Sequence, residues 1–305
     1  MKTDLDHLPE RKRRDLERAV RILFAEFADA TALATQKWKK QGRVLKVILY
    51  GSHARGDWVA DTKGGYFSDY DLLVVVNDER LTDPLEYWAK ADDHLLRAVA
   101  IAKEIGAPVN FIVHSMADVN DQLARGRPFF IDIIEQGIAL YEAEGHPFGS
   151  PKPLTPDAVR AEAQKSFDYW YPLSVHALKL ARTSIEDGVL RDAAFMMHQA
   201  AERAYHCVLL VLTLYSPKSH KLNFLRSQAE GLAPDLIAVW PRDTRFGQRC
   251  FELLRQAYVN ARYSPHYKIS VAELEWLAER VELLQETVKA LSEARLASPR
   301  ADESE

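Results

Sequence analysis

The chain has 305 residues, of which 47% are hydrophobic and 28% are charged, and its formal net charge is −4. This length allows two domains, and the composition is that of an ordinary globular protein. The small negative charge excludes a global attraction to nucleic acid or acidic lipid, although it is compatible with a local basic patch.

Membrane and export signals are absent from the sequence pattern. The longest apolar run, residues 207–212, is far shorter than the roughly 20 residues that span a bilayer. The charged N-terminus lacks the apolar core of a secretory signal. Cys207 and Cys250 lie in apolar helical patterns and do not make a disulfide framework. We therefore expect a cytoplasmic protein with no membrane partner.

The first half of the chain mixes strand and helix patterns. Apolar residues recur at three- and four-residue steps where helices are expected, and β-branched apolar runs predict buried strands. The predicted elements, in chain order, are a helix over residues 10–41, strands at Val44–Tyr50 and Ser68–Val76, a helical stretch around Pro84–Ile105, a third strand at Val109–Val113 and a short closing helix over residues 129–142.

A cluster of Gly, Pro and Ser at residues 145–156 predicts a domain boundary. We expect a first domain over residues 1–144, a linker over 145–156 and a second domain over 157–305. Beyond the linker the pattern predicts helices alone, separated by glycines and prolines. Together these patterns predict an α+β protein, in which a small mixed sheet precedes an all-α helical bundle. The predicted helices are Asp157–Asp187, Arg191–Tyr215, Lys221–Leu232, Thr244–Tyr263 and Val271–Ala297.

Two motifs in the first domain carry chemistry. Asp69 and Asp71 are two residues apart on a predicted strand, so their side chains leave the same face. Two carboxylates are costly to bury unpaired, and a bound Mg²⁺, which is often held by one or two carboxylates plus phosphates, removes that cost. Gly51 allows close backbone approach, and Ser52 can cap a helix whose N-terminus binds phosphate. The pattern favours a nucleoside triphosphate held for in-line attack, although a solvated carboxylate pair beside a plain turn is the alternative.

Residues 44–115 resemble the minimal nucleotidyltransferases of the DNA polymerase β superfamily. Their signature is GS, a spacer, DxD and a third acid on a later strand. The resemblance implies that Gly51 and Ser52, with Arg55 in the same motif, bind the nucleotide, and that Asp69 and Asp71 hold the metal. It also implies Mg²⁺ and ATP, or another nucleoside triphosphate, as the bound species.

The sequence departs from that signature at two places. The spacer between Ser52 and Asp69 holds 16 residues, and it includes an apparent insertion at Gly64-Gly65-Tyr66. The position of the third carboxylate is taken by Asn110, and an amide is no general base near neutral pH. Asp118 is an alternative if the chain folds back. These departures put catalysis, but not nucleotide binding, in question.

The second domain ends one helix with Arg262 and places His266 shortly after it. Such a pair can bind phosphate or an RNA backbone, and the histidine can act as acid or base. A cation in the last turn is, however, also expected from the helix dipole alone. His198 and His206 are expected to be core or surface residues, because no acidic partner pattern is evident between them. His220 is interpreted as a loop or cap residue, with a role near Arg262 as the alternative.

Residues 158–295 resemble HEPN domains through HQAAERAYHCVLL, His220-Lys221-Leu222 and AYVNARYSPHY. The resemblance implies a helical bundle that forms homodimers and often cleaves RNA with an Arg–His pair. Four to six residues usually separate that pair, whereas three separate Arg262 and His266 here, so the ribonuclease interpretation is weaker. Some relatives bind nucleotides instead.

The leading hypothesis is transfer of AMP from ATP to a small molecule, as in aminoglycoside nucleotidyltransferases, or to a tyrosine. In two-gene toxin–antitoxin relatives, the nucleotidyltransferase adenylylates a tyrosine beside the HEPN site, and Tyr263 and Tyr267 are the corresponding candidates. The alternatives are a HEPN ribonuclease controlled by the first domain and a non-catalytic nucleotide-binding regulator.

Overall fold

The computed structural model describes residues 1–61 and 66–297, and these residues form two compact units that meet in sequence at Leu154 and Thr155. The first unit contains a mixed sheet with helices, and every described element of the second unit is a helix, so the predicted α+β class is confirmed. The elements of the first unit are α1 (Glu10–Ala32), α2 (Lys37–Lys40), β1 (Val44–Tyr50), α3 (Ser52–Arg55), β2 (Ala60–Asp61), β3 (Tyr66–Phe67), β4 (Tyr70–Val76), η1 (Glu79–Thr82), η2 (Pro84–Trp88), α4 (Ala89–Ala100), β5 (Val109–Ser115), α5 (Met116–Ala124), α6 (Pro128–Gln136) and β6 (Ile138–Glu142).

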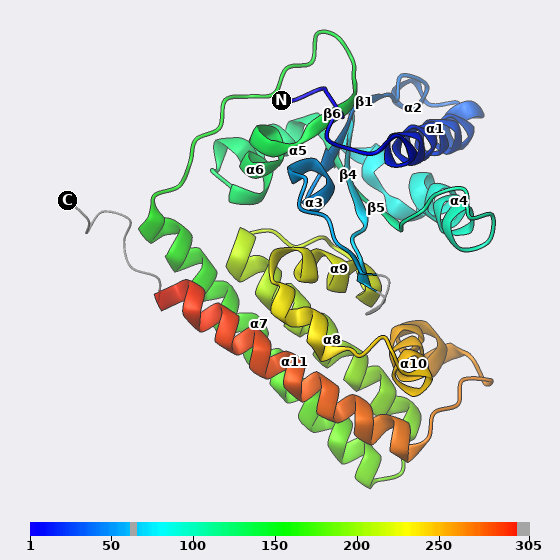
Figure 1. Cartoon of the computed structure of the whole chain (residues 1–305), viewed down its shortest axis with the longest axis vertical. Helices are drawn as coiled ribbons and strands as arrows, with labels where there is room; N and C mark the ends of the chain where they lie inside the picture. Colours follow the sequence, from blue (N-terminus) through cyan, green and yellow to red (C-terminus); the bar gives the residue numbers. More distant parts are fainter. Residues whose placement is uncertain (62–65, 298–305) are drawn as a thin grey trace. The chain divides into compact units, whose positions relative to one another are not determined.

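The main sheet has the strand order β5-β4-β1-β6. β1 is antiparallel to both of its neighbours, and β4 is parallel to β5. Asp71 is paired with Tyr50 on one side and with Asn110 on the other. In Figure 1 the sheet lies between α1 and α4 on one side and α5 and α6 on the other. This register sets the start of β4 beside the end of β1 and the start of β5.

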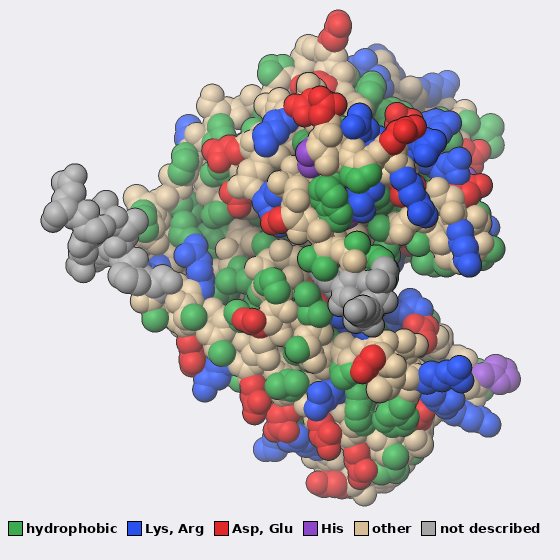
Figure 2. All heavy atoms as spheres, in the orientation of Figure 1, with side chains coloured by type: hydrophobic (Ala, Val, Ile, Leu, Met, Phe, Trp, Pro, Cys, Tyr) green, Lys and Arg blue, Asp and Glu red, His purple; other side chains and the backbone are tan. Residues whose placement is uncertain are grey.

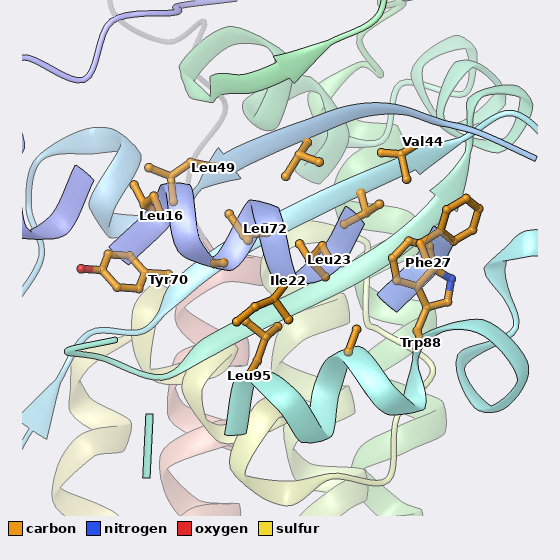
Figure 3. Packing of buried hydrophobic residues seen from close by; sticks show 14 of the residues in the cluster. Leu16, Ile22, Leu23, Phe27, Val44, Leu49, Tyr70, Leu72, Trp88 and Leu95 are labelled. Carbon is orange, nitrogen blue, oxygen red and sulfur yellow. The ribbon is translucent and has the colours of Figure 1, made fainter. Parts of the chain in front are cut away.

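One face of the sheet carries the core of the first unit. Alternate residues of β1 and β4 pack there against α1 and α4, as expected for strands whose side chains alternate between two faces. Figure 3 shows α1 side chains lying along these strands, with Tyr70 at one end of the cluster and Trp88 at the other. The opposite set of residues, which includes Asp71 on β4 and Asn110 on β5, therefore faces α5 and α6. The labelled members of the core are Leu16, Ile22, Leu23, Phe27, Val44, Leu49, Tyr70, Leu72, Trp88 and Leu95.

The outward face of α1 and the adjoining α2 is charged. Figure 2 shows Lys and Arg side chains interspersed with Asp and Glu on this part of the first unit. Arg14 pairs with Glu10 along α1, and Lys39 of α2 pairs with Glu86 of η2. The amphipathic pattern of α1 thus has one apolar face for the sheet and one polar face for water.

Two predicted helices differ from the structure. The helix predicted over residues 10–41 ends at Ala32, because its apolar period stops after Phe27 and Leu33 is 95% exposed. The helix predicted over residues 129–142 is wrong in its second half, where Ile138–Glu142 pairs with β1 as an edge strand. Gly137 makes the transition, with an extended backbone.

The remaining differences are at element ends. The second predicted strand begins at Tyr70 rather than Ser68, because the backbone and hydroxyl of Ser68 bond to Val59 instead of joining the ladder. The third strand continues to Ser115. The stretch predicted as helical over residues 84–105 begins with a π-helical turn, η2, and α4 ends at Ala100.

Residues expected to form a linker are bonded to the first unit. The backbone N–H of Gly149 donates to Asn120 Oδ1 at 2.8 Å, and that of Lys152 donates to the carbonyl oxygen of Leu123 at 3.1 Å. Both partners lie in α5. The first compact unit accordingly extends to Leu154 rather than ending before Gly145.

The second unit is built around α8, which packs against α7, α9, α10 and α11. Its long, largely apolar sequence explains this position, because a helix that is apolar on most sides must be covered on most sides. The five predicted helices are confirmed, and a short 3₁₀ helix at Pro234–Val239 was not predicted. The elements are α7 (Pro156–Glu186), α8 (Leu190–Thr213), α9 (Leu222–Leu232), η3 (Pro234–Val239), α10 (Arg245–Tyr263) and α11 (Val271–Ala297).

Candidate functional site

The turn after β1 brings Gly51 against the side chain of Asp71. Gly51 has φ +73° and ψ −154°, a backbone region that is essentially limited to glycine. A Cβ atom at Gly51 would lie 2.8 Å from Asp71 Oδ2. Ser52 begins α3, which is a single helical turn. The glycine therefore supplies both the backbone conformation and the space that let the carboxylate approach the turn.

Asp69, Asp71 and Asn110 lie together at one end of the sheet. Asn110 is paired with Asp71 in the parallel ladder, and its Nδ2 donates a hydrogen bond of 2.8 Å to Asp69 Oδ2. Asp69 directly precedes β4 and is separated from Asp71 by one residue, a distance of about 7 Å along an extended chain. The residue at the expected third-carboxylate position thus contacts the first carboxylate of the pair.

The chemistry of these side chains fits a hard divalent cation. Their potential ligand atoms are all oxygens, which Mg²⁺ prefers. Within residues 1–61 and 66–297, no three His, Cys, Asp or Glu side chains are grouped so that they could hold a metal ion. Asp69 and Asp71 would hold Mg²⁺ together with phosphate oxygens of a nucleotide, because one or two carboxylates plus substrate phosphates are a usual ligand set for this ion.

His53 is buried directly behind these carboxylates. Its Nδ1 lies 2.9 Å from the backbone oxygen of Asp69, and its Nε2 lies 3.0 Å from Lys12 Nζ. Because an ammonium group only donates, Nε2 accepts from Lys12 and Nδ1–H donates to Asp69. Burial, aided by the charge of Lys12, lowers the pKa of His53 to about 4. The imidazole is therefore neutral at physiological pH.

Aromatic rings enclose the Lys12–His53 contact. The imidazole stacks on Trp58 with a centroid distance of 5.7 Å and lies 4.4 Å from the ring of Tyr70. Lys12 Nζ lies 5.4 Å and 5.3 Å from the centroids of the same two rings. Burial lowers the pKa of Lys12. The sequence motif contains His53, but nothing in the pattern connects it with Lys12, which precedes it by 41 residues.

Arg55 ends the helical turn that begins at Ser52. Its Nε donates to Asp57 Oδ2 at 3.1 Å, and both side chains are partly exposed. Its charge also acts on Asp132 of α6. Burial raises the pKa of this carboxyl, and the charge of Arg55 partly opposes the rise. The structure thus places the Arg55 guanidinium beside the turn, within electrostatic reach of α6.

The long spacer does not separate the two motifs in space. Val59 and Ser68 are joined by two hydrogen bonds of 2.9 Å, one from Ser68 N to the Val59 oxygen and one from Val59 N to Ser68 Oγ. β2 and β3 continue from them as a hairpin. The insertion predicted at Gly64-Gly65-Tyr66 is centred on glycines outside the described residues. The segment between Val59 and Ser68 therefore begins and ends at neighbouring points in space.

Asp118 does not take the place of the third carboxylate. It lies in α5, and its Oδ2 is 2.5 Å from Nδ1 of His114. His114 is opposite Val75, four residues along β5 from Asn110 and therefore about 13 Å away along the strand. The alternative in which the chain folds back to bring Asp118 to the site is wrong, because α5 starts at the far end of β5.

In the second unit, Arg262 and His266 are both exposed. Arg262 Nε donates to the Tyr258 carbonyl oxygen at 2.7 Å, and its guanidinium lies 4.6 Å from the centroid of the Tyr258 ring. His266 follows the end of α10, where its backbone N–H donates to Ser264 Oγ at 3.3 Å. The Arg262 side chain is therefore held over the Tyr258 ring. The hydrogen bond of His266 to Ser264, by contrast, involves the backbone of His266 and not its imidazole.

Another histidine shares the Tyr258 ring with Arg262. His220 stacks on Tyr258 with a centroid distance of 4.4 Å and an interplanar angle of 11°. Its Nδ1 lies 2.8 Å from Oε1 of Glu202, which is buried on α8. Burial raises the pKa of Glu202, and His220 opposes that shift. The alternative role of His220 near Arg262 thus has a structural basis.

Glu202 also lies between the two histidines of α8. It is four residues from each, and its carboxylate is 3.4 Å from His198 Nδ1 and 3.9 Å from His206 Nε2. The expectation that no acidic partner separates these histidines was wrong, because i,i+4 spacing places all three on one helix face. Burial lowers the pKa of His198 to about 3 and that of His206 to about 4.

The two tyrosines near Arg262 differ in access. Tyr263 is 74% exposed. Tyr267 is buried, and its hydroxyl donates to the Leu253 carbonyl oxygen at 2.9 Å. Of this pair, Tyr263 is therefore the one accessible from solvent.

The class of protein follows from the fold, the GS turn and the paired carboxylates. The family profile described as "Nucleotidyltransferase domain" matches residues 34–135, and the profile described as "HEPN domain" matches residues 168–291. The chain belongs to the nucleotidyltransferases and carries a HEPN domain as its second unit.

One curated relative and one solved structure are similar to the chain. A Methanocaldococcus jannaschii protein named "Putative protein adenylyltransferase" is 30% identical over 105 residues, which cover 34% of this chain and 86% of the relative. A nucleotidyltransferase-like protein from Exiguobacterium sibiricum aligns with 12% identity over 92% of this chain and 78% of its own, with a TM-score of 0.28. That score is too low to support a conclusion about a shared fold.

A membrane-spanning helix is not found in the part of the chain that the structure describes, since each helix there is too short or too polar.

Proposed function

We propose that the first unit binds a magnesium-bound nucleoside triphosphate, with ATP as the preferred species, and transfers its nucleoside monophosphate to an acceptor hydroxyl. The observation that carries this proposal is the close approach of the Asp71 carboxylate to Gly51. Asp69 lies at the same end of the sheet, where it is bonded to Asn110. This arrangement joins a carboxylate pair that suits Mg²⁺ to a turn whose backbone a phosphate can approach. The similarity to a relative named as an adenylyltransferase supports AMP as the transferred group.

Each residue has a distinct role in this proposal. Gly51 and Ser52 bind the phosphates through the turn, and Arg55 adds positive charge beside them. Asp69 and Asp71 hold the metal, which would neutralise phosphate charge and orient the α-phosphorus. The acceptor oxygen forms a bond to the α-phosphorus, and the bond to the bridging oxygen of pyrophosphate breaks.

The proposed reaction needs a group that removes the proton from the acceptor hydroxyl. Asn110 stands where a carboxylate would receive that proton, and an amide cannot receive it near neutral pH. We therefore expect nucleotide binding with slow transfer. A complete lack of transfer would make the protein a nucleotide-binding regulator, which is the non-catalytic alternative.

We infer that the acceptor is a small molecule or a tyrosine. Tyr263 is the candidate tyrosine of the second unit, because it is exposed whereas Tyr267 is buried. Incubation with labelled ATP and Mg²⁺, followed by mass spectrometry, would detect a tyrosine carrying AMP. Label on Tyr263, absent in Tyr263→Phe, is the expected result for a protein acceptor, and unlabelled protein would favour a small molecule.

Calorimetry tests the binding step directly. Asp71→Asn should abolish Mg²⁺-dependent binding of a non-hydrolysable ATP analogue, because it removes one of the two charges that hold the metal. The melting temperature should stay nearly the same, since the amide has the shape of the carboxylate. Asp57→Asn, which removes a partly exposed carboxylate from the same turn, is the matched control. Unchanged affinity in Asp71→Asn would reject the metal assignment.

A second candidate function is RNA cleavage by the HEPN domain. The specific observation in its favour is that the Tyr258 ring centroid lies 4.4 Å from the His220 ring and 4.6 Å from the Arg262 guanidinium. We propose that His220, held by Glu202, serves as the acid–base group with Arg262, and that His266 is not required. Loss of RNA cleavage in His220→Ala but not in His266→Ala is the expected result, and the reverse pattern would restore the Arg262–His266 pair.

A further inference from the structure

The contact between Lys12 and His53 joins three segments that are distant in sequence. Lys12 belongs to α1, His53 to the turn after β1, and Asp69 to the entry of β4. His53 touches both of the others, through Nε2 and Nδ1 respectively. His7 adds a further contact, because its Nε2 lies 2.8 Å from the backbone oxygen of His53. The His53 imidazole therefore links the turn after β1 to the backbone of Asp69.

The position of Asp69 depends on such contacts. Asp69 lies outside the strand ladder, between the inserted hairpin and Tyr70, where β4 begins. Its carboxylate is held from one side by Asn110, and its backbone carbonyl is held from the other by His53. Groups that orient a metal ligand without touching the metal commonly affect metal affinity by about 10–100-fold.

The orientation of the imidazole is itself determined. Its ring plane is nearly parallel to that of Trp58, with an interplanar angle of 6°. Its tautomer is set from both sides, since an ammonium 3.0 Å from Nε2 and an acceptor carbonyl oxygen 2.9 Å from Nδ1 both place the ring proton on Nδ1. Only that tautomer donates to the carbonyl oxygen of Asp69.

We propose that His53 is a positioning residue whose Nδ1–H holds Asp69 in the orientation that takes the metal of the bound nucleotide, and that Lys12 holds the imidazole in place by donating to its Nε2. This inference rests on the proposed function of the first unit. It assigns roles to two residues that would make no contact with the metal or the nucleotide.

Two substitutions at the same position separate the two hydrogen bonds. The amide nitrogen of Asn occupies roughly the place of Nδ1, so His53→Asn keeps the donor to Asp69 and loses the acceptor for Lys12. The amide oxygen of Gln reaches roughly the place of Nε2, so His53→Gln keeps the contact with Lys12 and loses the donor to Asp69. Both remove a buried ring, so a purely structural role predicts similar losses of stability and of binding in the two variants.

The experiment is calorimetry of a non-hydrolysable ATP analogue with and without Mg²⁺, using the full chain. We expect His53→Gln to weaken Mg²⁺-dependent binding by about 10–100-fold and His53→Asn to stay within a few-fold of the native protein. Binding without Mg²⁺ should be the same in all three proteins. Equal affinities of the two variants would overturn the inference while leaving the proposed function intact. Absence of Mg²⁺-dependent binding in the native protein would instead overturn the proposed function, and the inference with it.

A variant that keeps the ring provides a second measurement. Lys12→Met leaves the imidazole in place and removes the donor to its Nε2. Nitrogen NMR near neutral pH should find the His53 proton on Nδ1 in the native protein, and Lys12→Met, which loses the donor to Nε2, should weaken Mg²⁺-dependent binding. A native ring protonated on Nε2 would overturn the inference even if the His53 variants do not fold, and native affinity in Lys12→Met would overturn the role of Lys12.

Discussion

At the scale of single residues, Asn110 decides how the site can work. Its amide is within hydrogen-bonding distance of Asp69 Oδ2, at 2.8 Å. A carboxylate at this position would repel Asp69 when no metal is bound and would provide a third charge when one is. In the proposed site, the amide would therefore stabilise the metal-free form at the expense of a general base.

Asn110→Asp should raise the rate of α-phosphoryl transfer to water or tyrosine, because general-base assistance contributes about 10²–10⁴-fold. It should also lower the melting temperature in the absence of Mg²⁺, since two carboxylates then face each other. Release of pyrophosphate from labelled ATP measures the first effect, and thermal melting with and without Mg²⁺ measures the second. Fast turnover by the native protein would show that another group, or the substrate, supplies the base.

Gly51→Ala should destabilise the first unit by about 1–3 kcal/mol, the usual cost of a non-glycine residue in this backbone region. It should also abolish nucleotide binding, because the new Cβ would lie 2.8 Å from Asp71 Oδ2. Gly145→Ala is the control, since Gly145 also has a positive φ but no atom within 4 Å of the added Cβ. Chemical unfolding and calorimetry check the two effects, and native affinity in Gly51→Ala would contradict the close approach.

At the scale of elements, the inserted hairpin can be separated from the site. Val59 and Ser68 already bond to each other as the first and last residues of a tight turn would. Replacing residues 60–67 with Asn-Gly, which favours two-residue hairpin turns, should therefore leave Mg²⁺-dependent nucleotide binding within a few-fold of native. Calorimetry provides the measurement. A large loss of affinity would mean that the insertion contributes to nucleotide binding.

α8 carries buried histidines whose titration should make the second unit acid-sensitive. The pKa values of His198 and His206 are lowered to about 3 and about 4, mainly by burial. Between the ordinary histidine pKa of about 6.5 and these values, the unfolded chain binds more protons than the folded one. The free energy of unfolding therefore falls as the pH falls through this window. Burial raises the pKa of Glu202, which acts in the opposite direction by favouring a protonated carboxyl in the folded state.

His198→Leu should make the stability less dependent on pH. One titrating imidazole contributes up to about 1.4 kcal/mol per pH unit, so the loss of stability between about pH 6.5 and pH 5 should shrink by about 2 kcal/mol. Urea unfolding followed by far-ultraviolet circular dichroism at both pH values is the measurement. His176→Leu, at an exposed position of α7, should leave the pH dependence unchanged. The same change in both variants would argue against the buried imidazole as the cause.

At the scale of the whole molecule, we propose that the chain forms a homodimer through its second unit. Tyr169 and Leu180 of α7 are 62% and 41% exposed, and their separation of about three helical turns places them on one face. Isologous pairing is the commonest way in which such faces are covered.

Light scattering at micromolar concentration should give twice the chain mass of 34.7 kDa. Tyr169→Glu combined with Leu180→Glu should shift the protein to a monomer, because charge on both residues opposes burial of that face. Leu85→Glu, which changes an 87% exposed leucine of the first unit, should remain dimeric. A monomeric native protein would contradict the proposal.

Local patterns in the sequence were sufficient to predict the elements whose signals are strong. β1 and β4 were predicted because β-branched apolar runs suit buried strands, and the helices of the second unit because breakers separate apolar periods. The common face of Asp69 and Asp71 stays a prediction from the two-residue period of a strand, because Asp69 lies just before β4 begins. Gly51 was recognised for close backbone approach, and the structure shows which atom makes that approach.

Pairings between distant segments became evident only in the folded chain. Ile138–Glu142 is compatible with either a helix or a strand by its pattern, and the edge of β1 selects the strand by supplying hydrogen-bond partners. The Lys12–His53 and Glu202–His220 contacts depend in the same way on the fold. The physical reason is that periodicity specifies which face of an element is buried, whereas a hydrogen bond needs two atoms within about 3 Å, and only folding brings them to that distance.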